Sequence, residues 1–188
     1  MSYEQKDFSY LLGLEGFSDQ LLNNHFALYQ GYVTNCNKLA NLLKQKEMEI
    51  PEYAELKRRF GWEFDGMRLH ELYFGNMAKE TKPLDENSEL FKKIEENFQK
   101  FANWEKDFKA TGAMRGIGWV VLYQDGNNLF NIWINEHDMG HLTGAKPLLV
   151  MDVFEHAYLA DYGLKKADYI EAFFKTIDWQ IVSQRFQS

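Results

Sequence analysis

The hydrophobic pattern of this chain changes its period partway along the sequence. Residues 18–45 and 51–79 carry apolar side chains at the three- and four-residue spacing of amphipathic helices, and Ser18 is a candidate N-cap. The two stretches are joined by a short connection, which predicts an antiparallel helical hairpin. Residues 80–88, ETKPLDENS, have turn composition and mark the expected boundary of this first unit.

Beyond this boundary the pattern becomes that of a mixed helix and sheet unit. Two runs rich in β-branched and aromatic residues flank an Asp-Gly turn signal at Asp125, which favours a hairpin of strands. The expected elements are one or two helices within 89–109, strands at 118–123, 129–134 and 147–151, and a helix over 167–185.

Composition excludes several classes of protein. The net charge of −7 disfavours non-specific nucleic-acid binding, which needs a basic surface. No run reaches the roughly 18 apolar residues of a membrane span, so we expect no membrane partner. The single cysteine, Cys36, cannot form an internal disulfide, and the polar N-terminus lacks a signal-peptide pattern, so we expect a reducing cytoplasm.

Residues with metal-ligating chemistry are few. The five histidines are His25, His70, His137, His141 and His156. Asp152 ends a strand-like run and His156 follows four residues later, so the two side chains can ligate one metal. Read alone, a salt-linked Asp–His pair and two hydrogen-bonded core histidines in the helices explain the pattern equally simply. A metal held between the hairpin and the sheet unit would explain why each unit supplies ligand types.

The order of several motifs resembles the iron/manganese superoxide dismutases. Residues 152–159, DVFEHAYL, are similar to the D-x-W-E-H-A-Y-Y motif of that family. The other matching segments are Gly116-Ile-Gly118-Trp119, His70 before Tyr73 and Phe74, His25 before Tyr32-Val33, and the ending Tyr169 to Trp179. The resemblance covers nearly the whole chain.

The resemblance implies an α+β fold, in which an N-terminal α-helical hairpin domain (1–84) precedes an α/β domain (85–188) with a small three-stranded antiparallel sheet. It also implies a superoxide dismutase that redox-cycles one Fe or Mn ion per subunit, with superoxide as its substrate. The implied metal ligands are His25, His70, Asp152 and His156. One solvent molecule would complete the coordination of the ion, which would lie between the domains. Imidazole and carboxylate suit both metals, and Val150, two residues before the aspartate, matches neither the glycine typical of manganese relatives nor the threonine typical of iron relatives.

Relatives place a glutamine beside the solvent ligand. One of its two family positions is Gly66 here, which cannot serve, and the other corresponds to His137. We therefore expect His137 to donate a hydrogen bond to that solvent. The Tyr32 hydroxyl is expected to meet His137 above the metal and to gate the entry of substrate. Trp119 and Phe154 are expected to form the aromatic wall of the site, and His141 is interpreted as structural.

The first helix departs from the family spacing. Six residues separate His25 from Tyr32, whereas the family has seven, and an ungapped match would place Asn24 on the ligand. Residues i and i+7 differ by only about 20° around a regular helix. A one-residue deletion therefore predicts that His25 ligates and that Tyr29 and Tyr32 share its face.

The resemblance also implies a homodimer or a dimer of dimers, in which Glu155 bridges to a ligand histidine of the partner. A second cross-subunit pair of the family is lost, because Leu28 or Tyr29 and Leu159 replace its members. Lys165 or Lys166 is expected to guide the anionic substrate, although solvated lysines are the alternative. Two other functions stay open: a catalytically weak metal-binding relative with a structural role, and a non-haem iron enzyme that uses two histidines and Asp152 without His25.

Overall fold

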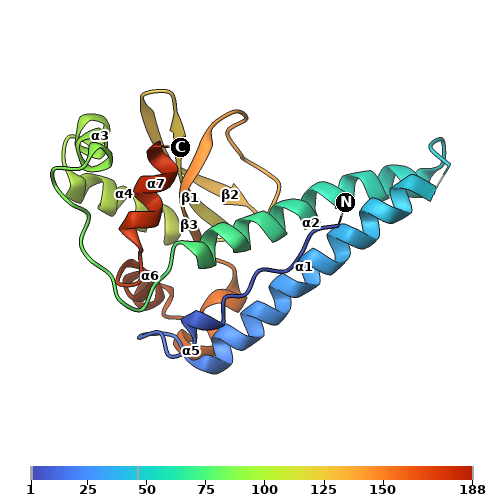
Figure 1. The fold of residues 1–188 in the computed structure, drawn as a ribbon, viewed down its shortest axis with the longest axis horizontal. Helices are drawn as coiled ribbons and strands as arrows, with labels where there is room; N and C mark the ends of the chain where they lie inside the picture. Colours follow the sequence, from blue (N-terminus) through green and yellow to red (C-terminus); the bar gives the residue numbers. More distant parts are fainter. Residues whose placement is uncertain (1, 46, 188) are drawn as a thin grey trace.

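The computed structural model describes residues 2–45 and 47–187, and its most extended feature is a helical hairpin. Helices α1 (Asp19–Gln45) and α2 (Pro51–Gly75) run antiparallel and form the long arm in Figure 1. Ser18 caps α1 as predicted, because its hydroxyl accepts a hydrogen bond from the backbone N–H of Leu21 at 3.1 Å. Pro51 occupies the first turn of α2, where a missing N–H costs nothing.

The second half builds a small sheet surrounded by helices. The expected α+β class and the antiparallel three-stranded sheet are confirmed, with strand order β2-β1-β3. The remaining elements are α3 (Glu89–Phe98), α4 (Phe101–Gly112), β1 (Gly118–Asp125), β2 (Asn128–Asn135), β3 (Lys146–Asp152), α5 (Leu159–Tyr162), α6 (Lys166–Phe174) and α7 (Trp179–Gln187), with short 3-10 turns at Ser9–Leu11 and Glu155–Ala157. Across the described residues, no helix is both long enough and apolar enough to span a membrane.

Two predicted helices are shorter than the sequence pattern indicated. Helix α2 ends at Gly75 rather than near residue 79, and the expected tail helix is divided into α6 and α7. Both interruptions have one cause, because the chain around Met77 leaves the helix to pair with the chain around Ile177 in an isolated antiparallel bridge. The backbone N–H of Ala78 donates to Thr176, and that of Asp178 donates to Asn76. The spacing of apolar residues in the sequence does not tell whether this segment forms such a bridge or one more turn of helix.

Asn76, at the end of α2, joins three parts of the fold. Its side chain is fully buried, donates to the carbonyls of Tyr73 and Val150, and accepts from the backbone N–H of Val150 at 2.9 Å. Val150 lies in β3, an edge strand of the sheet, so Asn76 satisfies backbone groups that no neighbouring strand reaches. The Asn76 amide thereby ties the end of α2 to β3, and Arg185 of α7 adds hydrogen bonds to Asn76 Oδ1 and to the carbonyls of Leu72 and Leu148.

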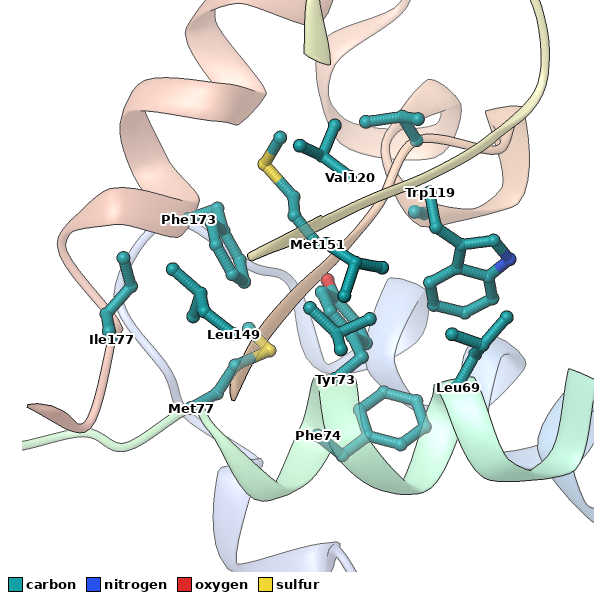
Figure 2. Packing of buried hydrophobic residues seen from close by; sticks show 14 of the residues in the cluster. Leu69, Tyr73, Phe74, Met77, Trp119, Val120, Leu149, Met151, Phe173 and Ile177 are labelled. Carbon is teal, nitrogen blue, oxygen red and sulfur yellow. The ribbon is translucent and has the colours of Figure 1, made fainter. Parts of the chain in front are cut away.

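Apolar side chains pack together where α2 crosses β3. Figure 2 shows Tyr73 of α2 beside Leu149 and Met151 of the strand. Phe173 of α6 stacks on Tyr73 at a ring-centroid distance of 5.8 Å. Because α2 packs between α1 and the sheet, its buried face is set against a rigid support. His70 lies on the buried face of this helix, so its position is fixed by the same packing.

We predict that Asn76→Ala lowers the free energy of unfolding by about 2–4 kcal/mol, because it removes the hydrogen bonds that the Asn76 amide makes to the buried backbone N–H and carbonyl of Val150. Asn103→Ala is the matched control, since its amide donates a single exposed bond to Phe98. Urea denaturation monitored by circular dichroism measures both. Equal losses in the two variants would contradict the role assigned to Asn76.

Candidate metal centre

Four ligand-type side chains meet where the hairpin touches the sheet. His25 lies on α1, His70 on α2, Asp152 at the end of β3, and His156 in the 3-10 turn that follows. One ligand atom from each lies within 4.8 Å of all the others. The sequence analysis grouped these same four residues, and the structure brings them together from elements up to 131 positions apart in the numbering (25 to 156).

The environment of His70 indicates what the cluster is built to hold. Its Nδ1–H donates to the carbonyl of Gly66 at 2.6 Å, which leaves a lone pair on Nε2. That Nε2 is buried without a hydrogen-bond partner and lies 3.7 Å from the Asp152 carboxylate. A buried unpaired nitrogen is costly unless it binds something. Three imidazoles and one carboxylate form a donor set that suits iron or manganese, so the residues fit such an ion.

Asp152 is the negative centre of the cluster. Its Oδ2 lies 3.2 Å from His25 Nε2 and 3.0 Å from His156 Nε2, and its Oδ1 accepts from the backbone N–H of Phe154. Complete burial would raise the pKa of Asp152, but the charge and hydrogen bonds of His156 and His25 outweigh burial and hold that pKa below its usual value. The carboxylate therefore stays ionised and ready to ligate.

The three imidazoles differ in exposure. His25 and His70 are almost fully buried, and burial lowers the pKa of each, so both rings are kept neutral as ligation requires. The side chain of His156 is 27% exposed, so the cluster is open to solvent or to a partner on this side.

Helix α1 places His25, and not Asn24, in the cluster. The helix is α-helical throughout, without a wide turn, and Asn24 is exposed while His25 points into the cluster. Tyr29 and Tyr32 are buried on the same side, and their rings lie 6.3 Å and 5.0 Å from that of His70. The predicted arrangement of a regular helix with one residue fewer is the one observed.

His137 lies beside the cluster and is held at both ring nitrogens. The indole N–H of Trp119 donates to Nδ1 at 3.0 Å, so the proton of a neutral ring is on Nε2. Nε2 lies 2.7 Å from the hydroxyl oxygen of Tyr32. The Nε2–H that we expected to point at a solvent ligand is thus directed at Tyr32. Phe154 stacks on the His137 ring at 4.7 Å, which places it in the aromatic wall.

Gly66 makes room for this pair. A Cβ on Gly66 would lie 2.8 Å from two ring carbons of Tyr32 and 3.3 Å from Cδ2 of His137. Position 66 can therefore carry only glycine while Tyr32 and His137 keep their places.

The sequence analysis did not single out Trp62, which contributes to this region. Trp62 packs 4.4 Å from the His137 ring, and its indole N–H donates to Glu136, which has a positive φ of 52° just before His137. His141, interpreted as structural, donates from Nε2 to the carbonyl of His137 at 2.7 Å and contacts Tyr123 through Nδ1. Trp62 lies four residues before Gly66 on α2, and this helical spacing is the only sequence signal that indicates it.

The remaining predicted residues lie at the edges of the site. Glu155 is exposed next to His156. Lys165 is exposed, whereas Lys166 donates to the backbone carbonyl of Met114 and its Nζ lies 5.6 Å from the centre of the Trp133 ring. Burial lowers the pKa of Lys166.

Comparison with known proteins agrees with this geometry. Residues 86–185 match the family described as iron/manganese superoxide dismutases, C-terminal domain. The chain is 36% identical to a superoxide dismutase (Fe) of Aquifex pyrophilus, over 98% of this chain and 91% of the relative. It is 34% identical to superoxide dismutase (Mn) 2 of Haloferax volcanii, over 100% and 96%. Relatives named for either metal are thus about equally similar.

We predict that Gly66→Ala displaces Tyr32 or His137 and lowers the melting temperature, because the added Cβ overlaps the tyrosine ring. Gly61→Ala is the control on the same helix, where a Cβ meets nothing within 4 Å and should stabilise by up to about 1 kcal/mol. Calorimetry measures both variants. A Gly66→Ala protein as stable as Gly61→Ala would show that the packing around Tyr32 is looser than described.

The stability of the metal-free protein should fall in mild acid. Burial lowers the pKa of His137 from 6.5 to about 4, so between these values the unfolded chain binds a proton that the folded chain does not. This residue should cost up to about 2 kcal/mol between pH 6.5 and pH 4.5. His137→Gln removes that contribution, whereas the buried ligand histidines contribute to both proteins. Urea titrations at the two pH values test this, and an identical pH dependence in both proteins would contradict it.

Proposed function

The chain belongs to the iron/manganese superoxide dismutase family, and we propose that it converts two superoxide ions and two protons to dioxygen and hydrogen peroxide, using one Fe or Mn ion per subunit. The observation that carries this proposal is the convergence of His25, His70, Asp152 and His156, with the free nitrogen of His70 turned toward the carboxylate. These four residues would hold the ion. Iron or manganese would supply one-electron chemistry through two oxidation states.

The described contacts define a route for one of the protons. Because Trp119 fixes the proton of neutral His137 on Nε2, that N–H donates to the oxygen of Tyr32. The Tyr32 hydroxyl is then left to donate its own proton on the cluster side. Burial raises the pKa of Tyr32, so the hydroxyl stays protonated at neutral pH. We therefore assign Tyr32 as the proton donor to reduced substrate and His137 as the group that orients and reprotonates it.

The aromatic residues around the cluster limit access to it. Trp119 is fully buried, and its ring lies 4.9 Å from that of His70. Phe154 stacks between His137 and His156 at 4.7 and 5.1 Å. An apolar enclosure of this kind admits a small anion while restricting water and larger reductants.

The assembly belongs to the same proposal. We propose a cytoplasmic homodimer or dimer of dimers in which Glu155 reaches His156 of the partner subunit, supported by the exposure of Glu155 and the open side of His156. Leu28 and Leu159 are both exposed, at 36% and 45%, and would replace the lost polar pair by an apolar contact. Lys165 and Lys166 as guides for the substrate, and the division into domains 1–84 and 85–188, stay predictions.

The geometry of α1 removes the main argument for each of the two alternative functions. An iron enzyme with two histidines and Asp152 requires His25 to lie elsewhere, but its Nε2 is 3.2 Å from the Asp152 carboxylate. The catalytically weak relative was suggested partly by the altered spacing in the first helix, and that spacing places His25 and Tyr32 on one face.

The test separates binding from turnover. Asp152→Ala should abolish tight metal binding, because it removes the anionic ligand, and metal analysis after dialysis measures this. His137→Ala should retain the metal but lower superoxide consumption by about 10- to 100-fold, because it removes a supporting hydrogen bond and no ligand. A metal-loaded wild-type protein that does not consume superoxide would refute the proposed function, and unchanged turnover in His137→Ala would remove His137 from the mechanism.

A further inference from the structure

A small cavity opens beside Tyr32 on the hairpin. It has a volume of about 190 Å³ and is lined by Leu28, Gly31, Tyr32, Asn35, Arg59, Trp62 and Glu63. Arg59 is the one cationic side chain in this lining. The cavity joins the protein surface to the residue that we assign as the proton donor.

Arg59 is held in a fixed position over the ring that covers His137. Its Nε and Nη2 lie 2.9 and 2.8 Å from Oε1 of Glu63. Its guanidinium carbon stands 3.9 Å from the centre of the Trp62 ring, which in turn packs 4.4 Å from His137 and 5.5 Å from Tyr32. Arg59, Trp62 and His137 therefore form consecutive layers from the surface to the site.

The ion pair with Glu63 does not remove the attraction for an anion. The Glu63 side chain is 3% exposed, whereas that of Arg59 is 53% exposed, so an anion that approaches from solvent meets the positive group first. Asn35 also donates a hydrogen bond to Glu63 beneath the guanidinium, so Arg59 is not the only donor to this carboxylate. Within the described part of the chain, no hydrogen bond uses Nη1 of Arg59, so its N–H groups can donate to an incoming anion.

We propose that Arg59 is an anion-guiding residue, which attracts superoxide to the cavity beside Tyr32 and so sets the rate of encounter. The inference rests on the proposed function. It is needed because a chain with a net charge of −7 repels an anionic substrate unless a local cation focuses it. Arg59 would act on capture and not on the chemical step, so kcat should be unaffected.

Arg58 provides a matched control. It precedes Arg59 on α2, pairs with Glu55, is 74% exposed and does not line the cavity. Arg58→Gln and Arg59→Gln change the net charge of the protein equally, but Arg59→Gln also removes the ion-pair partner of the buried Glu63, whereas Glu55 is exposed. We expect Arg59→Gln to lower kcat/KM about two- to fivefold at low ionic strength. The difference in kcat/KM from wild type should disappear near 0.5 M salt, because the Debye length there is only about 4 Å and more distant charges are screened. Arg58→Gln should stay close to wild type.

Two further measurements keep the test decisive. Arg59→Lys retains the charge and should restore most of kcat/KM, which separates guidance from loss of packing around Glu63. The dissociation constant of azide, a small monovalent anion, measured by absorption of the iron(III)-loaded proteins, should rise in Arg59→Gln by about the same factor as kcat/KM falls.

Equal effects of Arg58→Gln and Arg59→Gln would overturn the proposal, as would an Arg59→Lys protein as impaired as Arg59→Gln. A wild-type protein that binds azide but does not consume superoxide would instead refute the proposed function, and the azide comparison would still decide the role of Arg59.

Discussion

The buried carboxylate of Asp152 is the constraint on which the site depends. An isolated charge with no exposure costs several kcal/mol, so the fold must surround it with groups that compensate. It does so with His25 of α1 and His156 after β3 on one carboxylate oxygen, and with the Phe154 N–H on the other. The hairpin and the sheet are thus positioned around one anion, and the hydroxyl of Tyr169 also fixes its backbone carbonyl at 2.6 Å.

The layer next to these ligands is set by volume as much as by hydrogen bonding. His137 and Tyr32 occupy the space that a side chain at position 66 would fill, so the absence of one atom on α2 allows a histidine from the β2–β3 loop to reach the site. Trp119 then selects the tautomer of that histidine, which decides where the proton of Tyr32 can go. A steric feature of one helix therefore determines which hydrogen bond the Tyr32 hydroxyl makes.

The sequence was sufficient where the argument depended on local geometry. Six residues between His25 and Tyr32 place both on one face only if the helix is regular, and the regular helix α1 is what the structure contains. It was insufficient where distant segments decide the outcome. The bridge between Met77 and Ile177 ends α2 and interrupts the tail helix, yet its partners are 100 positions apart (77 to 177), and apolar spacing carries no trace of it. The layering of Arg59 and Trp62 over His137 depends likewise on how a loop of the sheet unit meets the hairpin.

Metal binding and stability are coupled in this arrangement. In the metal-free chain, the lone pair of His70 Nε2 is buried without a partner, and the rings of His25 and His70 meet edge to face at 5.0 Å. The fold therefore bears a desolvation cost at its centre before any ion binds. An ion that binds only the folded state stabilises that state by mass action. Part of the stability of the metal-loaded protein would therefore come from the binding of the ion to the cluster around Asp152.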